Sequence, residues 1–147
     1  MYQHIMLPLD GSELSLKAAD EGIGLAKVMG AKLTLITVVT PYQTHVTPAV
    51  SLNQVIDQRH DEEARQLAQK MQANVVSQAK SKGVQCEGMV VVRDNPYREI
   101  IDNAVARKCD LIVMASHGRR GIGAVLIGSE TAKVLTHSKI PVLVVRP

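Results

Sequence analysis

The segment with the most chemical potential is a glycine-rich stretch at residues 114–131. It contains Gly118, nine further residues and then Gly128-Ser129, where a helix is expected to begin. Glycines let backbone N–H groups approach an anion with no Cβ in the way, and a helix N-terminus attracts negative charge by about 0.3–1 kcal/mol. Arg119 and Arg120 add positive charge. The stretch indicates phosphate binding, although it matches neither a P-loop nor G-x-G-x-x-G. A surface loop whose glycines only form turns could have the same sequence pattern.

A second group with binding chemistry is the carboxylate of Asp10. It ends the run Leu7-Pro8-Leu9-Asp10, directly before Gly11-Ser12. A carboxylate there can accept hydrogen bonds from ribose hydroxyls or hold a magnesium ion on phosphates. Capping of the following helix explains it equally well, because Asp and Ser are common N-cap residues. If the first and fourth strands are neighbours, both groups meet at one crevice.

Five short apolar runs alternate with four helical patterns and must position these groups. This alternation predicts an α/β fold, an open parallel sheet with helices on both faces, formed by one domain over residues 1–147. Ligands bind such sheets beyond the carboxyl ends of the strands, where the strand order reverses. The expected strands are 4–9, 32–39, 84–92, 110–115 and 141–145, and the expected helices are 13–29, 52–81, 97–107 and 129–136.

Apolar spacing also predicts which helix faces are buried. In the long second helix the expected buried positions are Ala64, Leu67, Ala68, Met71, Val75 and Ala79, with Gln69 and Gln72 on the solvated opposite face. In the third helix they are Tyr97, Ile100, Ile101, Ala104 and Val105.

Composition narrows the function class. The formal charge of +3 is spread along the chain, without the basic stripe and aromatic platforms typical of nucleic-acid binders. The longest apolar runs are too short to span a bilayer, and the N-terminus does not resemble a signal peptide. Cys86 and Cys109 have no metal-ligand spacing and fit a reducing compartment. We therefore expect a cytoplasmic protein that binds neither nucleic acid nor membranes.

Over nearly its whole length the chain resembles the universal stress proteins. The resemblance is carried by Pro8 and Asp10 and by the runs 113–118, 126–129 and 140–145. ATP-binding members of that family carry a glycine, two residues, a second glycine, nine residues, and then glycine with Ser or Thr. Here the second glycine is Gly118 and the motif closes at Gly128-Ser129, but Ala115 replaces the first glycine. If that position requires positive φ, the alanine is strained and binding is weakened.

The resemblance implies an adenine nucleotide alpha hydrolase-like, Rossmann-like fold with strand order 3-2-1-4-5. It also implies a site for ATP, or for ADP or AMP, with magnesium as the counter-ion, held in part by Asp10. The backbone of Val38 would read adenine, and Glu130 would contribute only its N–H. The implied nucleotide-binding residues are Pro8, Leu9, Asp10, Val38, Met114, Ala115, Ser116, His117, Gly118, Arg119, Gly128, Ser129, Glu130 and Thr131.

Little in the sequence indicates catalysis. The five histidines show no metal-ligand spacing. Ser116 and His117 are adjacent at a strand end, so their side chains are expected to point in opposite directions and not to pair. No lysine, magnesium ligand and water-positioning residue form an in-line hydrolysis site. We expect no dedicated enzyme and at most weak ATP hydrolysis.

These observations favour a nucleotide-binding stress-response regulator that acts through nucleotide occupancy and through dimer or partner contacts. Two alternatives stay open: a scaffold of the same fold without nucleotide binding, which Ala115 supports, and a slow ATPase. The last strand is apolar and is expected at a sheet edge, which invites pairing with another chain, and the family dimerises there. We expect a homodimer through Pro141, Val142, Leu143, Val144 and Val145, and a protein partner that the sequence does not identify.

Overall fold

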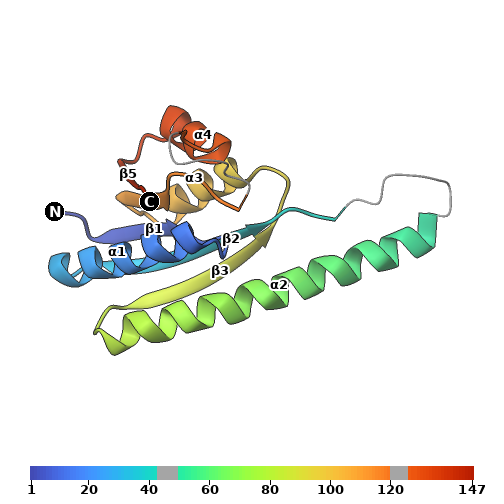
Figure 1. Cartoon of the computed structure of the whole chain (residues 1–147), viewed down its shortest axis with the longest axis horizontal. Helices are drawn as coiled ribbons and strands as arrows, with labels where there is room; N and C mark the ends of the chain where they lie inside the picture. Colours follow the sequence, from blue (N-terminus) through green and yellow to red (C-terminus); the bar gives the residue numbers. More distant parts are fainter. Residues whose placement is uncertain (43–49, 120–125) are drawn as a thin grey trace.

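The core of the fold is a five-stranded parallel sheet (Figure 1). The computed structural model describes residues 1–42, 50–119 and 126–147, with no side chains described for 50–54. Arg120 and most of the loop expected at 41–48 lie outside the described residues. The strands are β1 (His4–Pro8), β2 (Lys32–Val39), β3 (Cys86–Val92), β4 (Leu111–Ala115) and β5 (Val142–Val145).

The strand order is β3-β2-β1-β4-β5, with every neighbouring pair parallel, as expected. The order reverses between β1 and β4, the starting strands of the two halves of the sheet. Their register pairs Ile5 with Leu111 and Met6 with Ile112, so their carboxyl ends lie side by side. The residues that follow β1 and β4 therefore meet where parallel sheets bind ligands.

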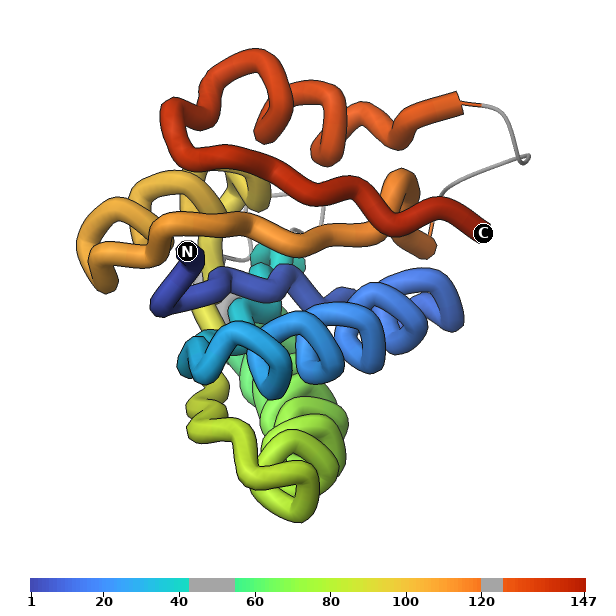
Figure 2. Tube along the Cα trace, turned by 90° about the vertical axis from the view of Figure 1, so that its left-hand side faces the viewer, coloured from blue at the N-terminus to red at the C-terminus, as the bar shows by residue number. Residues whose placement is uncertain are grey.

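Four helices cover the two faces of the sheet: α1 (Glu13–Met29), α2 (Val50–Ser81), α3 (Pro96–Ala106) and α4 (Ser129–His137). Helices α1 and α2 lie on one face and α3 and α4 on the other (Figure 2). Of the helices described, none is both long and apolar enough to cross a membrane. The expected helices and strands are confirmed, with ends that shift by one or two residues.

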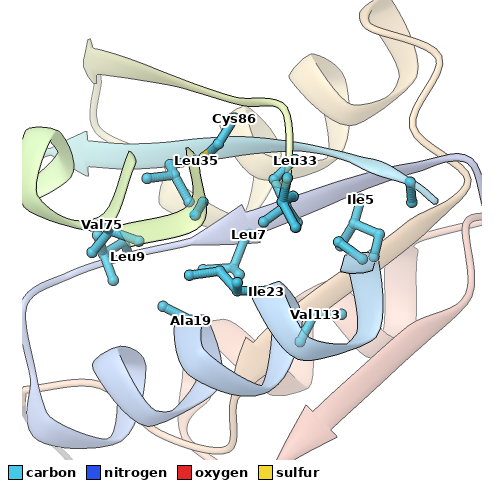
Figure 3. Close-up of a cluster of buried hydrophobic side chains, with 14 of the residues drawn as sticks. Ile5, Leu7, Leu9, Ala19, Ile23, Leu33, Leu35, Val75, Cys86 and Val113 are labelled. Carbon is cyan, nitrogen blue, oxygen red and sulfur yellow. The ribbon is translucent and has the colours of Figure 1, made fainter. Parts of the chain in front are cut away.

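Alternating side chains of the central strands fill two separate cores. Ile5 and Leu7 of β1 and the adjoining Leu9 pack against α1 and α2 (Figure 3). Met6 points the other way, to the core beneath α3 and α4. This alternation follows from the strand period of two residues, and it fixes which side chains at the strand ends face which helix pair.

The buried face of α2 differs from the expected one. Leu67 is 67% exposed, whereas Gln72, assigned to the solvated face, is only 4% exposed. The true buried stripe is Ala68, Gln72, Val75 and Ala79, at spacings of four, three and four residues, which matches the helical period better. In α3, Val105 was likewise expected to be buried but is exposed. The physical reason is that Leu67 and Val105 are apolar residues on solvent-facing positions, whereas Gln72 can be buried because its amide donates to Thr37 and Met89.

Two glycines of α1 offer a matched test of the packing between α1 and the sheet. A Cβ on Gly22 would lie 2.5 Å from Leu7 Cδ1, whereas a Cβ on Gly24 would meet nothing within 4 Å. We expect Gly24→Ala to stabilise the protein by about 0.5–1 kcal/mol through helix propensity. The free energy of unfolding of Gly22→Ala should be about 1–3 kcal/mol lower than that of Gly24→Ala, because the added methyl group overpacks the contact with Leu7. Urea unfolding measures both; equal free energies of unfolding would contradict the packing.

Candidate functional site

The turn after β1 and the segment after β4 are joined directly by the Asp10 carboxylate. Asp10 Oδ2 accepts a hydrogen bond from the Arg119 backbone N–H at 3.0 Å, across 109 residues of sequence. Asp10 Oδ1 accepts from the Ser12 N–H at 2.9 Å. The two chemically suggestive segments of the sequence therefore lie together, at the carboxyl ends of β1 and β4.

Helix capping is the task of Ser12. The Ser12 hydroxyl is the N-cap of α1 and accepts from the Ser15 N–H at 3.2 Å. Asp10 instead stabilises the turn that leads to this cap and reaches across to Arg119. Each oxygen of the Asp10 carboxylate therefore accepts a hydrogen bond from the backbone of a different segment.

Asp10 is held ionised by its surroundings. Burial by itself would raise its pKa, but hydrogen bonds from Ser12, Ser15 and the Arg119 backbone together outweigh burial and lower the pKa below its usual value. The Arg119 guanidinium also lies nearby, with Nη2 2.7 Å from the point that a Cβ on Gly11 would occupy. The turn therefore presents a carboxylate beside a cationic group.

The lowered pKa of Asp10 predicts a pH dependence of stability. The unfolded chain binds the proton more readily, so the contribution of Asp10 is fully present above the unfolded pKa of about 3.9. It is lost as the pH falls through the lower folded pKa. In Asp10→Asn, the free energy of unfolding should therefore fall less steeply between about pH 5 and pH 2. Urea unfolding at several pH values tests this; parallel curves for variant and wild type would contradict it.

The two motif glycines are required by close contacts and not by backbone conformation. A Cβ on Gly118 would lie 2.3 Å from Asp10 Oδ2. A Cβ on Gly128 would lie 3.1 Å from His117 Cα, because the Gly128 N–H donates to the Ser116 carbonyl at 2.7 Å. Neither glycine has positive φ. The nine-residue spacing thus returns the chain to the point where it left β4.

The N-terminus of α4 opens next to this contact. Its N-cap is Gly128, which has no side chain with which to cap the first-turn N–H groups of Ser129, Glu130 and Thr131. The Thr131 hydroxyl donates to the Ala115 carbonyl at 2.9 Å and ties the helix to the end of β4. Backbone N–H groups in this arrangement can bind an anion.

The Glu130 side chain turns toward α3. Its carboxylate accepts from the Tyr97 N–H at 2.9 Å and pairs with Lys133 Nζ at 3.0 Å. Glu130 thereby satisfies an N–H group in the first turn of α3. This leaves its backbone N–H as the group that it can offer at the start of α4.

Ala115 is unstrained. It is the last residue of β4, its φ is not positive, and it is 8% exposed. Its methyl group packs with Leu14 and Ala18 of α1. The strain that was considered for an alanine at this motif position is therefore absent.

The residues expected to bind adenine lie at or near the carboxyl ends of β1, β2 and β4, close to Asp10. The side chains of Val38 and Met114 share the core beneath α3 and α4, and Pro8 follows Met6 on that face by strand alternation. Even-numbered residues of β2 direct their backbone groups toward β1, as in the bond from Lys32 N–H to the Gln3 carbonyl. The Val38 backbone thus faces the space beyond the end of β1. Leu9 is 2% exposed, with its side chain in the opposite core.

The expectation that Ser116 and His117 do not pair is wrong. Ser116 Oγ lies 3.2 Å from His117 Nδ1. Both residues come after the last residue of β4, so strand alternation no longer governs their side chains. Ser116 is only 4% exposed and its carbonyl binds Gly128. A buried hydroxyl in this position is a structural link and not an accessible nucleophile.

Thr37 and Gln72 are supporting residues that sequence reasoning missed. The Thr37 hydroxyl donates to the Leu9 carbonyl at 2.7 Å, and Gln72 Nε2 donates to Thr37 Oγ1 at 2.8 Å. The signal that could have found Gln72 is its position on the buried stripe of α2. Thr37 could have been noticed as a hydroxyl near the end of an otherwise apolar strand.

Comparison with known proteins agrees with this architecture. The model of the Universal stress protein family matches residues 1–146. Universal stress protein MJ0531 of Methanocaldococcus jannaschii is 33% identical over 146 residues, which cover 99% of this chain and 83% of that protein.

Two solved structures are also similar. The structure of hypothetical protein MJ0577 has a TM-score of 0.85 at 24% identity, covers 100% of this chain and 97% of its own, and shows a shared fold. That fold is of the adenine nucleotide alpha hydrolase-like type. A universal stress protein in complex with cAMP has a TM-score of 0.71 at 28% identity, with 99% and 97% of the two chains covered.

Proposed function

Because the chain belongs to the universal stress protein family, we propose that it is a cytoplasmic regulator that binds ATP at the carboxyl ends of β1 and β4. Nucleotide occupancy would alter its contacts with a second copy or with another protein. The observation that carries the proposal is the hydrogen bond between Asp10 Oδ2 and the Arg119 N–H, which brings the carboxylate and the glycine motif together. A relative whose structure contains cAMP supports an adenine nucleotide as ligand.

Each part of the site has a chemical task in this proposal. Asp10 would accept from a ribose hydroxyl or hold Mg²⁺ on the phosphates. The N–H groups at Gly118 and at the start of α4, with the Arg119 side chain, would bind the phosphates. Val38 would bind adenine through its backbone, beside Pro8 and Met114. His117 would contact a phosphate. The bottom of the nucleotide site would be lined by the backbones of Leu9, Ala115 and Ser116.

The experiment is a titration of the purified protein with MgATP, together with an ultraviolet spectrum. With three Tyr and no Trp, the protein absorbs weakly, so co-purified adenine would dominate the spectrum. We expect saturable binding of MgATP, with ADP and AMP compared in parallel. No adenine and no binding would favour the scaffold alternative. Phosphate release well above the blank, abolished by Asp10→Ala, would favour the slow ATPase.

Ala115→Gly tests whether the missing motif glycine matters. Because Ala115 has no positive φ and its methyl group packs against α1, restoring glycine should leave the Kd for ATP nearly unchanged. The stability should fall by about 0.5–1 kcal/mol, since glycine in a strand costs backbone entropy and packing. Calorimetric titration and urea unfolding measure the two effects. A large gain in affinity would show that the methyl group obstructs the nucleotide.

We also propose a homodimer formed through β5. This strand lies at the edge of the sheet, paired only with β4 in the described part of the chain. Leu143 is 44% exposed on this strand, and an apolar edge strand is suited to pairing with another chain. The residues of the proposed interface are Pro141, Val142, Leu143, Val144 and Val145.

A further inference from the structure

Gln72 is a buried polar side chain whose hydrogen bonds reach two strands, β2 and β3, and lead through Thr37 to Leu9, the residue after β1. It is 4% exposed, although glutamine is usually a surface residue. Its Nε2 group donates to Thr37 Oγ1 of β2 and to the Met89 carbonyl of β3, both at 2.8 Å. Thr37, 7% exposed, donates in turn to the Leu9 carbonyl at 2.7 Å. Helix α2 is thereby linked to β3, to β2 and to the residue before Asp10.

Gly88 of β3 makes room for this side chain. A Cβ on Gly88 would lie 2.5 Å from Gln72 Oε1 and 3.2 Å from Gln72 Cδ. Glycine inside a strand weakens the strand and often marks a close approach of another group. The close-packed group is here the Gln72 amide.

The Leu9 carbonyl needs this support because regular strand pairing ends beside it. Strand β1 ends at Pro8, and the Leu9 N–H makes the last backbone bond to β2, to the Ile36 carbonyl at 2.8 Å. The next polar contact is the Thr37 hydroxyl. A hydroxyl can rotate among acceptors, and the donor from Gln72 leaves its hydrogen directed at Leu9.

Met71, the neighbour of Gln72 on α2, contacts the same turn. Its Sδ atom lies 2.8 Å from the point that a Cβ on Gly11 would occupy, and Arg119 Nη2 lies 2.7 Å from that point. Gly11 has a φ of +82°, a conformation that favours glycine. Helix α2 therefore supports both sides of Asp10, at Leu9 through Thr37 and at Gly11 through Met71.

We propose that Gln72, acting through Thr37, is a positioning residue that fixes the backbone of Leu9–Asp10 and Thr37–Val38 for nucleotide binding. Its effect on affinity rests on the proposed function. Its effect on the order of the two turns does not, and can be measured in ligand-free protein.

The first experiment measures amide hydrogen exchange by NMR in ligand-free Gln72→Leu, Thr37→Val and Thr37→Ser. Gln78→Leu is the matched control, because Gln78 is an exposed glutamine of α2 that donates to Asp20 Oδ1. Relative to the rest of the chain, amides at 9–12 and 37–39 should exchange about tenfold faster in Gln72→Leu and Thr37→Val. Thr37→Ser, which keeps the hydroxyl, and Gln78→Leu should resemble wild type. A uniform increase across the molecule, or no change, would overturn the proposal.

The second experiment titrates the same variants with MgATP. The Kd should rise about five- to tenfold in Gln72→Leu and in Thr37→Val, the effect of one hydrogen bond. Thr37→Ser should bind like wild type, and the Gln72→Leu/Thr37→Val double variant should bind like the weaker single variant. If wild type binds MgATP and both single variants bind it with the same Kd, the positioning role is refuted.

If wild type binds no nucleotide, the proposed function fails, and the exchange pattern still decides whether Gln72 orders the turns. Should Gln72→Leu not fold, the comparison of Thr37→Val with Thr37→Ser decides alone.

Discussion

Gly118→Ala is expected to weaken MgATP binding by about tenfold or more, a cost of the size seen for overpacking. A Cβ at this position would lie 2.3 Å from Asp10 Oδ2. Either the carboxylate or the backbone at Gly118–Arg119 must then move. Both are parts of the proposed site, and the hydrogen bond from the Arg119 N–H to Asp10 cannot survive the movement unchanged. Calorimetric titration with MgATP measures the effect.

Gly24→Ala is the matched control for this substitution, because a Cβ there meets nothing within 4 Å. It should bind MgATP like wild type. A second control is Gly118→Ala in an Asp10→Ala background, where the new methyl group has no carboxylate to displace. If the clash is the cause, the alanine at 118 adds little to the loss caused by Asp10→Ala. Additive losses would instead show that Gly118 acts independently of Asp10.

Leu143→Lys is expected to convert the proposed dimer into monomers. Leu143 pairs in register with Val113 of β4, lies on the edge strand and is 44% exposed. A lysine at this position can extend into water in the monomer, but in a β5–β5 interface it would be buried together with its symmetry mate. Unpaired buried charges are strongly unfavourable, and charged edge residues are a natural means of preventing strand pairing.

Light scattering during gel filtration tests this prediction. Wild type should have twice the chain mass of 15.9 kDa, and Leu143→Lys the chain mass itself. Leu67→Lys is the control, because Leu67 is an exposed leucine on α2, which lies away from β5. Val144→Lys should also give monomers, but Val144 is less exposed, so its effect includes some loss of monomer stability. A dimer that persists in both β5 variants would place the interface on another surface.

The order of elements and the fold class follow from the sequence by itself. Continuous apolar runs such as the one at Lys32–Val39 become strands buried on both faces, and the regular alternation with helices leaves a parallel sheet as the arrangement that buries them. The ends of α1 were also predictable, because Ser12 and Gly30 are capping residues whose chemistry acts locally. Local periodicity and capping need no knowledge of distant residues.

The roles of individual site residues depended on contacts between distant parts of the chain. Sequence left Asp10 between helix capping and ligand binding; the structure assigns the cap to Ser12 and joins Asp10 to the Arg119 N–H, and ligand binding by Asp10 stays a prediction. Sequence also left open whether Ala115 is strained; the structure places it at the end of β4 without a positive φ, so it is not. Sequence placed Gln72 in solvent, although the stripe of α2 buries it against Thr37. These outcomes rest on pairs of residues that approach each other only after β1 and β4 become neighbours and α2 packs on the sheet, and such proximity is a property of tertiary structure.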